Sequence, residues 1–182
     1  MRNNIDIYEV AEYYRLLDSF RFQKDSLDYA IADSHLREIE ASPLIANVAV
    51  SVYDNCRRTH IYESSYHKRL FTGPDGEFTE VRIHPDDFAA VMCGSIAALK
   101  FFLDNECDAK NHKFVRVYRA FAAGKYRPII EQLQLLDADK EGNPWLMLCI
   151  AEIIPSEMEP FKADSRIIDV VNQVVINPTE DK

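Results

Sequence analysis

The histidine and acidic side chains of this chain are the residues that could bind a metal ion or transfer protons. The five histidines form no H-E-x-x-H segment or comparable cluster: they are His35, His60, His67, His84 and His112. Glu63 and His67 stand four residues apart and could share a helix face, but two ligands do not make a metal site. We therefore predict no bound metal, and no pattern indicates a cofactor.

Nucleophilic and redox chemistry also lack a supporting motif. The sequence contains no G-x-S-x-G elbow and no glycine-rich phosphate loop. The four cysteines stand far apart and form no C-x-x-C pair: they are Cys56, Cys93, Cys107 and Cys149. This spacing favours reduced, structural thiols over a disulfide framework. We predict that the chain is not an enzyme. The enzyme that remains as an alternative is a small α+β protein with a cone-shaped fold, whose acid–base pair would come from His60, Asp54 or Glu131.

Two arginines could bind an acidic ligand. Arg116 and Arg119 fall on opposite faces of one predicted strand, so one of them could point inward and hold an acidic ligand or a carboxylate. A surface ion pair is the interpretation we favour.

The composition and net charge of the chain argue against several classes of protein. The 182 residues are 47% hydrophobic, enough to bury a core, which argues against disorder. There are 21 basic and 30 acidic residues, and the formal charge of -9 opposes binding to phosphate backbones or anionic lipid. No run approaches the about 18 apolar residues of a membrane span, and the first thirty residues do not resemble a signal peptide. We expect a cytoplasmic protein.

Helices precede strands along the chain. Apolar residues recur at helical spacing from Asn3 to Phe22 and from Ser26 to Glu40, which predicts two helices that pack on the domain or on a partner copy. Alternation from Val48 to Val52 predicts a strand, and Thr59 to Tyr62 its hairpin partner. A short helix, capped by Ser64 or Ser65, is expected up to Phe71, followed by the Gly73-Pro74-Asp75-Gly76 turn.

The longest predicted helix begins in the segment Ile83-His84-Pro85-Asp86-Asp87. Pro85 suits the first helical position, and Asp86 and Asp87 suit the first turn because they face the positive end of the helix dipole. His84 is interpreted as a residue of the helix start. A largely apolar stripe then extends to Leu103: it comprises Phe88, Val91, Met92, Ser95, Ile96, Leu99, Phe102 and Leu103.

Three strands with only loops between them follow this helix. They span 114–123, 126–137 and 145–154, and short connections require them to pair in antiparallel fashion. The apolar segment 165–176 could be a strand or a helix, because its periodicity does not choose between them. The segment 177–182 is expected to be solvated.

This order of elements resembles the PAS sensor domain. The resemblance covers 42–155 and is carried by the opening strand, by Ile83-His84-Pro85-Asp86-Asp87-Phe88, and by the closing pair of strands with its turn at Gly142-Asn143-Pro144-Trp145. It implies an α+β fold: a five-stranded antiparallel sheet with helices on one face that enclose a ligand cavity. Residues 1–41 would form an N-terminal dimerisation cap, and 156–182 a linker.

A helical extension followed by a PAS-like domain is similar to the sensory part of LuxR-type transcription regulators. It implies a noncatalytic, homodimeric signal sensor for a small apolar ligand, with a DNA-binding helix-turn-helix output domain outside this chain. A dimerisation or protein-interaction module without a ligand is the other alternative. The residues expected to line the cavity are Val50, Val52, Met92, Ile96, Leu99, Val117, Phe121, Leu133 and Met147.

Overall fold

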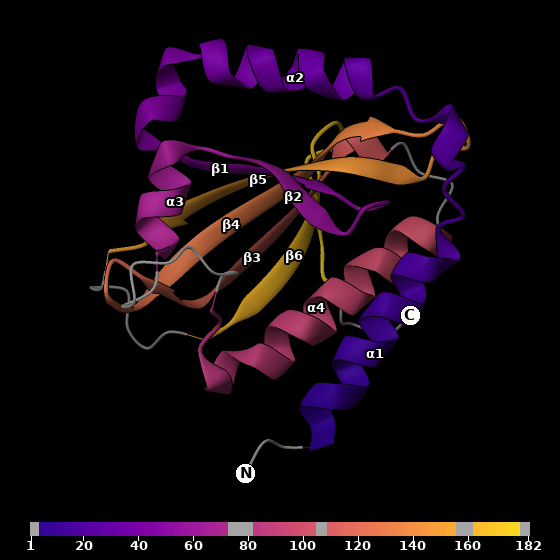
Figure 1. Ribbon diagram of the computed structural model, residues 1–182. Coiled ribbons are helices and arrows are strands. Elements are labelled where there is room, and N and C mark those ends of the chain that lie inside the picture. The colour runs from indigo at the N-terminus through magenta and orange to yellow at the C-terminus, as the bar shows by residue number, and fades with distance from the viewer. Residues whose placement is uncertain (1–3, 73–81, 105–108, 156–161, 179–182) are drawn as a thin grey trace.

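The chain forms one antiparallel sheet, in an α+β arrangement with four α-helices among the described residues (Figure 1). The computed structural model describes residues 4–72, 82–104, 109–155 and 162–178. The sheet has seven strands in the order β2-β1-β5-β4-β3-β6-β7. Their bounds are β1 Ala49–Asp54, β2 Thr59–Glu63, β3 His112–Ala122, β4 Lys125–Ala138, β5 Pro144–Ile153, β6 Asp164–Asp169 and β7 Val174–Ile176. All five predicted strands are present.

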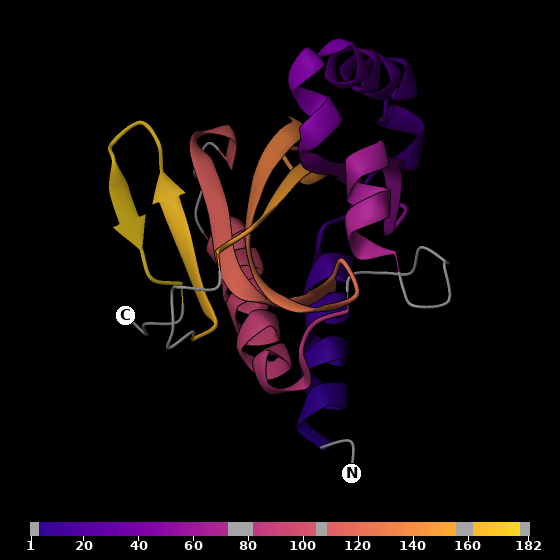
Figure 2. The ribbon, with the colours of Figure 1, turned by 90° about the vertical axis from the view of Figure 1, so that its left-hand side faces the viewer.

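The prediction of only five strands was wrong, because the segment after 162 adds a hairpin to the sheet. Strand β6 pairs with β3, and β7 pairs with β6 at the edge (Figure 2). Gln173 adopts a left-handed φ of 57°, and the carboxylate of Asp169 accepts the backbone N–H groups of Val171 and Asn172. These contacts close the turn between the two strands, a feature that hydrophobic periodicity does not report.

The helices lie where their patterns predicted them. Their bounds are α1 Asn4–Ser19, α2 Tyr29–Ala41, α3 Ser65–Phe71 and α4 Pro85–Asp104, with short 3-10 helices η1 Lys24–Ser26, η2 Pro43–Asn47 and η3 Ala109–Asn111. The Ser64 side chain caps α3 by accepting the N–H of His67. The predicted turn at 73–76 and Cys107 lie outside the described residues.

The helices cover both faces of the sheet, rather than one face as predicted. On the first face, Leu70 and Phe71 of α3 and Val91 of α4 pack with Tyr118 and Ile129. We call this side the α4 face. Helix α1 packs beside α4 (Figures 1 and 2).

On the opposite face, residues of the α2 region pack over one end of the sheet: Leu27 and Ala32 contact a cluster that includes Val52 and Leu146. The register confirms that the two clusters lie on opposite faces. Ala49 pairs with Ala151 and Val52 pairs with Leu148, and Ala49 and Val52 are three positions apart on β1, so their side chains point to opposite sides of the sheet. The α2 stripe, thin in the sequence, is sufficient to cover this end.

Helix α4 begins at Pro85, as predicted, and is held to strand β3 at that end. The ring Nδ1 of His84 accepts the N–H of Asp86 at 3.2 Å. The carboxylate of Asp87 accepts the backbone N–H of Arg119 at 2.8 Å and two guanidinium N–H groups at 2.9 and 2.6 Å. Burial acts to raise the pKa of Asp87, but the hydrogen bonds from Arg119 outweigh it and leave the pKa below its usual value. The helix start therefore carries a structural ion pair.

The buried side of α4 is narrower and less bulky than its apolar stripe suggested. Val91, Gly94, Ser95 and Ala98 are buried, whereas the larger Met92, Ile96 and Leu99 are only half-buried. A Cβ placed on Gly94 would lie 2.2 Å from the Oγ and 2.6 Å from the Cβ of Ser165 on β6. Small residues therefore allow α4 to approach the sheet closely.

Replacing Gly94 by alanine is expected to destabilise the protein by about 1–3 kcal/mol, because the added methyl group overpacks the contact with Ser165. In an exposed helix, the same change would stabilise by about 1 kcal/mol. Urea unfolding measures the difference, and the double variant Gly94→Ala/Ser165→Gly should recover much of the loss. A Gly94→Ala protein more stable than the wild type would contradict the close approach.

Candidate functional site

A charged cluster lies on the α4 face of the sheet, between the sheet and the helix. Arg116 of β3 and Glu131 of β4 are cross-strand neighbours, and the Arg116 Nε donates to Glu131 Oε2. Arg116 Nη1 donates to the Oγ of Ser95 on α4 at 3.0 Å, and the Tyr118 hydroxyl donates to Glu131 Oε2 at 3.1 Å. Only 18% of the Arg116 side chain and 10% of the Glu131 side chain are exposed. We call these four residues the Arg116–Glu131 cluster.

Strand alternation and helix periodicity bring the cluster together. Arg116 and Tyr118 are two residues apart on β3, and Glu131 lies directly opposite Arg116, so all three point to the same face. Ser95 lies on the buried side of α4, where its hydroxyl also donates to the carbonyl of Val91 at 2.8 Å. The hydroxyl therefore joins the helix backbone to the guanidinium of the sheet.

The surroundings keep Arg116 and Tyr118 each in one protonation state. Burial acts to lower the pKa of Arg116, but the charge of Glu131 outweighs it, so the pKa is raised and the guanidinium stays charged. Burial, with the charge of Glu131 adding to it, raises the pKa of Tyr118 well above its usual value, so the phenol remains a hydrogen-bond donor. Burial likewise raises the pKa of Tyr13 on α1.

The nearby cysteine is not poised for nucleophilic chemistry. Burial raises the pKa of Cys149 to about 12, and the charge of Glu131 adds to the rise. The thiolate is the reactive form of cysteine, so this side chain stays an unreactive thiol at neutral pH. The cluster offers a fixed positive charge, a carboxylate and two hydroxyl groups, which are groups for binding a polar molecule.

A surface ion pair was predicted for Arg116 and Arg119, and this is corrected for Arg116, whose ion pair is buried. Arg119 pairs with Asp87 near the surface, and its own side chain is 32% exposed. Arg116 also forms an ion pair, but a buried one, because its strand position faces α4 rather than solvent. Sequence reasoning placed Ser95 on the stripe of the long helix without giving it a role in a site, did not single out Tyr118, and named Glu131 only for the alternative enzyme. The available signal was an arginine and a tyrosine at alternate positions of an otherwise apolar strand.

The nine residues predicted to line a cavity do not share one side of the sheet. Leu133 packs on the α4 face with Phe114 and Ala98, and Met147 shares that face by register. By the same register, Val50, Val52, Val117 and Phe121 point to the other face. Met92, Ile96 and Leu99 are half-buried on α4. A cavity under α4 can draw only on Leu133 and Met147 from the predicted strand residues, and the ligand-contacting role of all nine stays a prediction.

The acid–base residues of the alternative enzyme lie apart. The Asp54 carboxylate accepts the hydroxyl of Tyr29 at 3.0 Å on the α2 side of the sheet, whereas Glu131 points to the α4 face. His60 is exposed on β2, near one edge. Across residues 4–72, 82–104, 109–155 and 162–178, the structure contains no group of three or more histidine, cysteine or acidic residues that could hold a metal ion.

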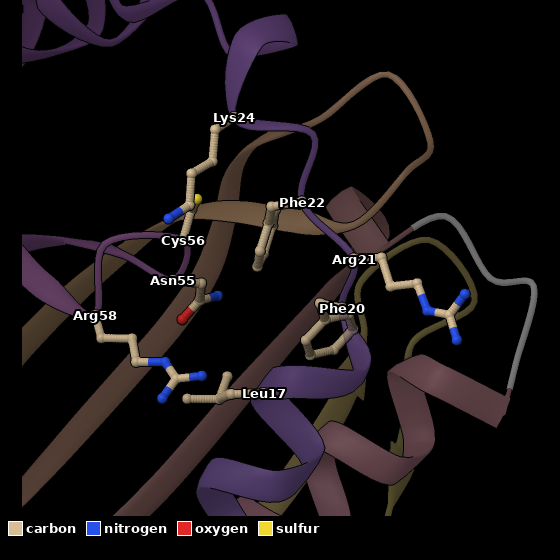
Figure 3. Close-up of a pocket in the computed structure, with 8 residues that line it drawn as sticks. All are labelled: Leu17, Phe20, Arg21, Phe22, Lys24, Asn55, Cys56 and Arg58. Atoms are coloured by element: carbon tan, nitrogen blue, oxygen red, sulfur yellow. The ribbon is translucent and has the colours of Figure 1, made fainter.

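Two hollows open at the surface. One, of about 400 Å³, lies between the end of α1 and the β1–β2 turn (Figure 3); the other, of about 330 Å³, lies beside β2. None of the nine predicted cavity residues lines either hollow.

Among the described helices, none is long and apolar enough to cross a membrane.

Comparison with known proteins finds a distant structural likeness. A solved structure, the phage VqmA-DPO complex, aligns with a TM-score of 0.41 and 12% identity over 67% of this chain and 54% of that chain. The aligned part thus spans about half the length of that chain. No family model and no curated protein matches. The likeness is too low to carry a functional argument, so the function must be argued from the geometry of this chain.

Proposed function

We propose that this chain is a noncatalytic, PAS-like sensory domain in which a small molecule is recognised next to the Arg116–Glu131 cluster. The single observation that carries the proposal is the buried ion pair held between the sheet and α4. A buried ion pair is costly to desolvate and is weak evidence for stability, so its presence at this interface points to a role in recognition.

The geometry provides a route from ligand to signal. Ser95 is the contact between Arg116 and α4, and α1 packs beside α4. A ligand that accepts a hydrogen bond from Arg116 competes with Ser95 and so favours a different packing of α4 and α1 on the sheet. A ligand shifts an equilibrium only by its difference in affinity for the two states, and the exchange of one charged hydrogen bond supplies such a difference.

The wider role is also part of the proposal and rests on the resemblance in sequence. The domain acts in the cytoplasm as a homodimer and passes its state to a DNA-binding output domain outside this chain. Its net charge of -9 supports a role in sensing rather than in direct contact with DNA. The separation of Asp54 from Glu131 on opposite faces supports a noncatalytic domain.

Native mass spectrometry of the purified protein, compared with a denatured sample, tests this function. We expect a retained small molecule that is released on denaturation, retained in the Ser95→Ala variant, which removes the competitor for the Arg116 N–H, and lost in the Arg116→Met/Glu131→Leu variant, which removes the donor. The variant Arg166→Gln is the matched control, because Arg166 belongs to an exposed ion pair on β6. A wild-type protein without a bound molecule, whose thermal unfolding is also unchanged by a small-molecule extract of its host cells, would instead indicate a dimerisation module.

A further inference from the structure

The hollow between the end of α1 and the β1–β2 turn combines an apolar floor with positive charge. Leu17 of α1 and Phe20, just after it, are 2% and 5% exposed, and the ring of Phe22 lies 6.1 Å from that of Phe20. Its volume of about 400 Å³ falls in the range of about 300–1,000 Å³ that is typical of small-molecule sites. The site draws on segments far apart in the sequence, because Asn55 and Cys56 of the β1–β2 turn close its other side.

The charge of the lining is opposite to that of the protein. Arg21, Lys24 and Arg58 line the hollow, and none of its described lining residues is acidic, although the chain carries 30 acidic and 21 basic residues. Figure 3 shows that Arg21 extends away from the other lining residues, whereas Lys24 reaches toward Cys56 and Arg58 toward Leu17. The charge that faces the hollow therefore comes from Lys24 and Arg58.

These two cations are placed differently. Arg58 donates to Asp18 through Nη2, and its guanidinium lies 5.5 Å from the ring centroid of Tyr14, which leaves other N–H donors of the fork available. No ion pair links Lys24 to a carboxylate within the described part of the chain. Burial and the charge of Asp54 raise the pKa of the Cys56 thiol, and the charge of Lys24 acts against that rise, which agrees with an ammonium group beside the lining.

A buried donor lies in the same region. Trp145 is 2% exposed, and its indole Nε1 has no hydrogen-bond partner among the described residues. It packs in the cluster that includes Phe22 and Cys56, two residues that line the hollow. Trp145 does not itself line the hollow but packs behind two of its lining residues, so its fluorescence can report on the hollow.

We infer that this hollow binds a small organic anion, a carboxylate on an apolar body, with Lys24 and Arg58 on the carboxylate and the half-buried ring of Phe22 on the body. The charge complementarity selects an anion over a cation, and the accessible ring of Phe22 selects an amphipathic anion over an inorganic one. The hollow shares no lining residue with the Arg116–Glu131 cluster, so this inference does not depend on the proposed function.

Octanoate is the probe, and the fluorescence of Trp145, the one tryptophan of the sequence, is the readout. We expect saturable binding of octanoate, and binding at least about tenfold weaker for octanol, octylamine and acetate, since each lacks the charge or the apolar body. Lys24→Gln and Arg58→Gln should each weaken octanoate binding by about tenfold or more, the usual loss for one hydrogen bond to a charged group.

Lys125→Gln is the matched control, because Lys125 is an exposed cation at the start of β4 and does not line the hollow. It should bind octanoate as the wild type does, and thermal unfolding should show all three variants folded. Absence of saturable binding, equal binding of octanol, or an equal loss in Lys125→Gln would overturn the inference. A small molecule retained at Arg116 should be unaffected by Lys24→Gln, which distinguishes this site from the sensory one.

Discussion

Replacing Arg116 by alanine is expected to lower the free energy of unfolding by about 3–5 kcal/mol, because it leaves the carboxylate of Glu131 buried without its charged partner. Tyr118 would remain as a hydrogen-bond donor to Glu131, but it is neutral and cannot compensate the charge. Chemical denaturation at neutral pH measures this loss. Because typical domains are stable by only about 5–15 kcal/mol, the variant should unfold at a much lower denaturant concentration.

Two further variants separate the ion pair from other effects. The double variant Arg116→Met/Glu131→Leu should be more stable than Arg116→Ala, since it removes both charges and fills the space with apolar groups. Arg166→Ala is the surface control: its partner is Asp164, both side chains are more than a third exposed, and its loss should be within about 1 kcal/mol. An Arg116→Ala protein no less stable than Arg166→Ala would show that the pair is not desolvated.

Acid is expected to destabilise the protein through His67, well before its carboxylates are protonated. His67 is 4% exposed on α3, and its ring lies 4.8 Å from that of Phe71. Burial lowers the pKa of His67 from 6.5 to about 4; the charges of His60 and Lys68 add to this, and that of Glu131 opposes it. The folded protein therefore holds a neutral ring between pH 6.5 and 4, whereas the unfolded chain takes up a proton.

The unfolded chain thus gains stability in acid that the folded protein does not. The stability of the fold is fully present above pH 6.5 and falls as the pH is lowered toward about 4. The loss reaches up to about 3 kcal/mol, because each tenfold difference in proton affinity between the two states corresponds to about 1.4 kcal/mol. Asp87 and Asp169, whose pKa values are lowered from 3.8, lose their contribution only below that pH, so they do not account for the change.

Urea unfolding between pH 7.5 and pH 4.5 measures the effect. His67→Phe keeps an aromatic ring but cannot be protonated, so its stability should change much less across this range, whatever its value at neutral pH. The control is Tyr66→Phe on the same helix, which changes the residue next to His67 without removing a histidine and should keep the wild-type pH dependence. A His67→Phe protein with the same acid sensitivity as the wild type would refute the assignment.

Local signals were enough to predict most individual elements. Proline at the first helical position, followed by Asp86 and Asp87, predicted the start of α4 because a helix terminus depends on groups within one turn. Alternation predicted the strands, since side-chain direction within a strand follows from the backbone alone. The apolar run 165–176 was undecided, because a strand of six residues and one of three, joined by a turn, have no period that separates them from a helix.

The predicted cavity residues lie on both faces of the sheet, which shows what local sequence patterns cannot predict. Val117 and Leu133 are both apolar residues of long strands, yet the register places Val117 opposite Ile130 and so on the face away from Leu133. Periodicity specifies alternate residues within each strand, but not which alternate set of one strand aligns with which set of the next. Only hydrogen-bond register answers that question.

The sequence by itself determined the α+β class, the antiparallel strands, the four helices of the described chain and the start of α4, because each depends on neighbours a few residues apart. Only the tertiary structure decided that Arg116 meets Glu131 and Ser95 in a buried cluster, that α2 covers the opposite face, and that Lys24 and Arg58 face one hollow. These features arise between segments from 15 to more than 30 residues apart, where packing and register, rather than local propensity, set which side chains meet.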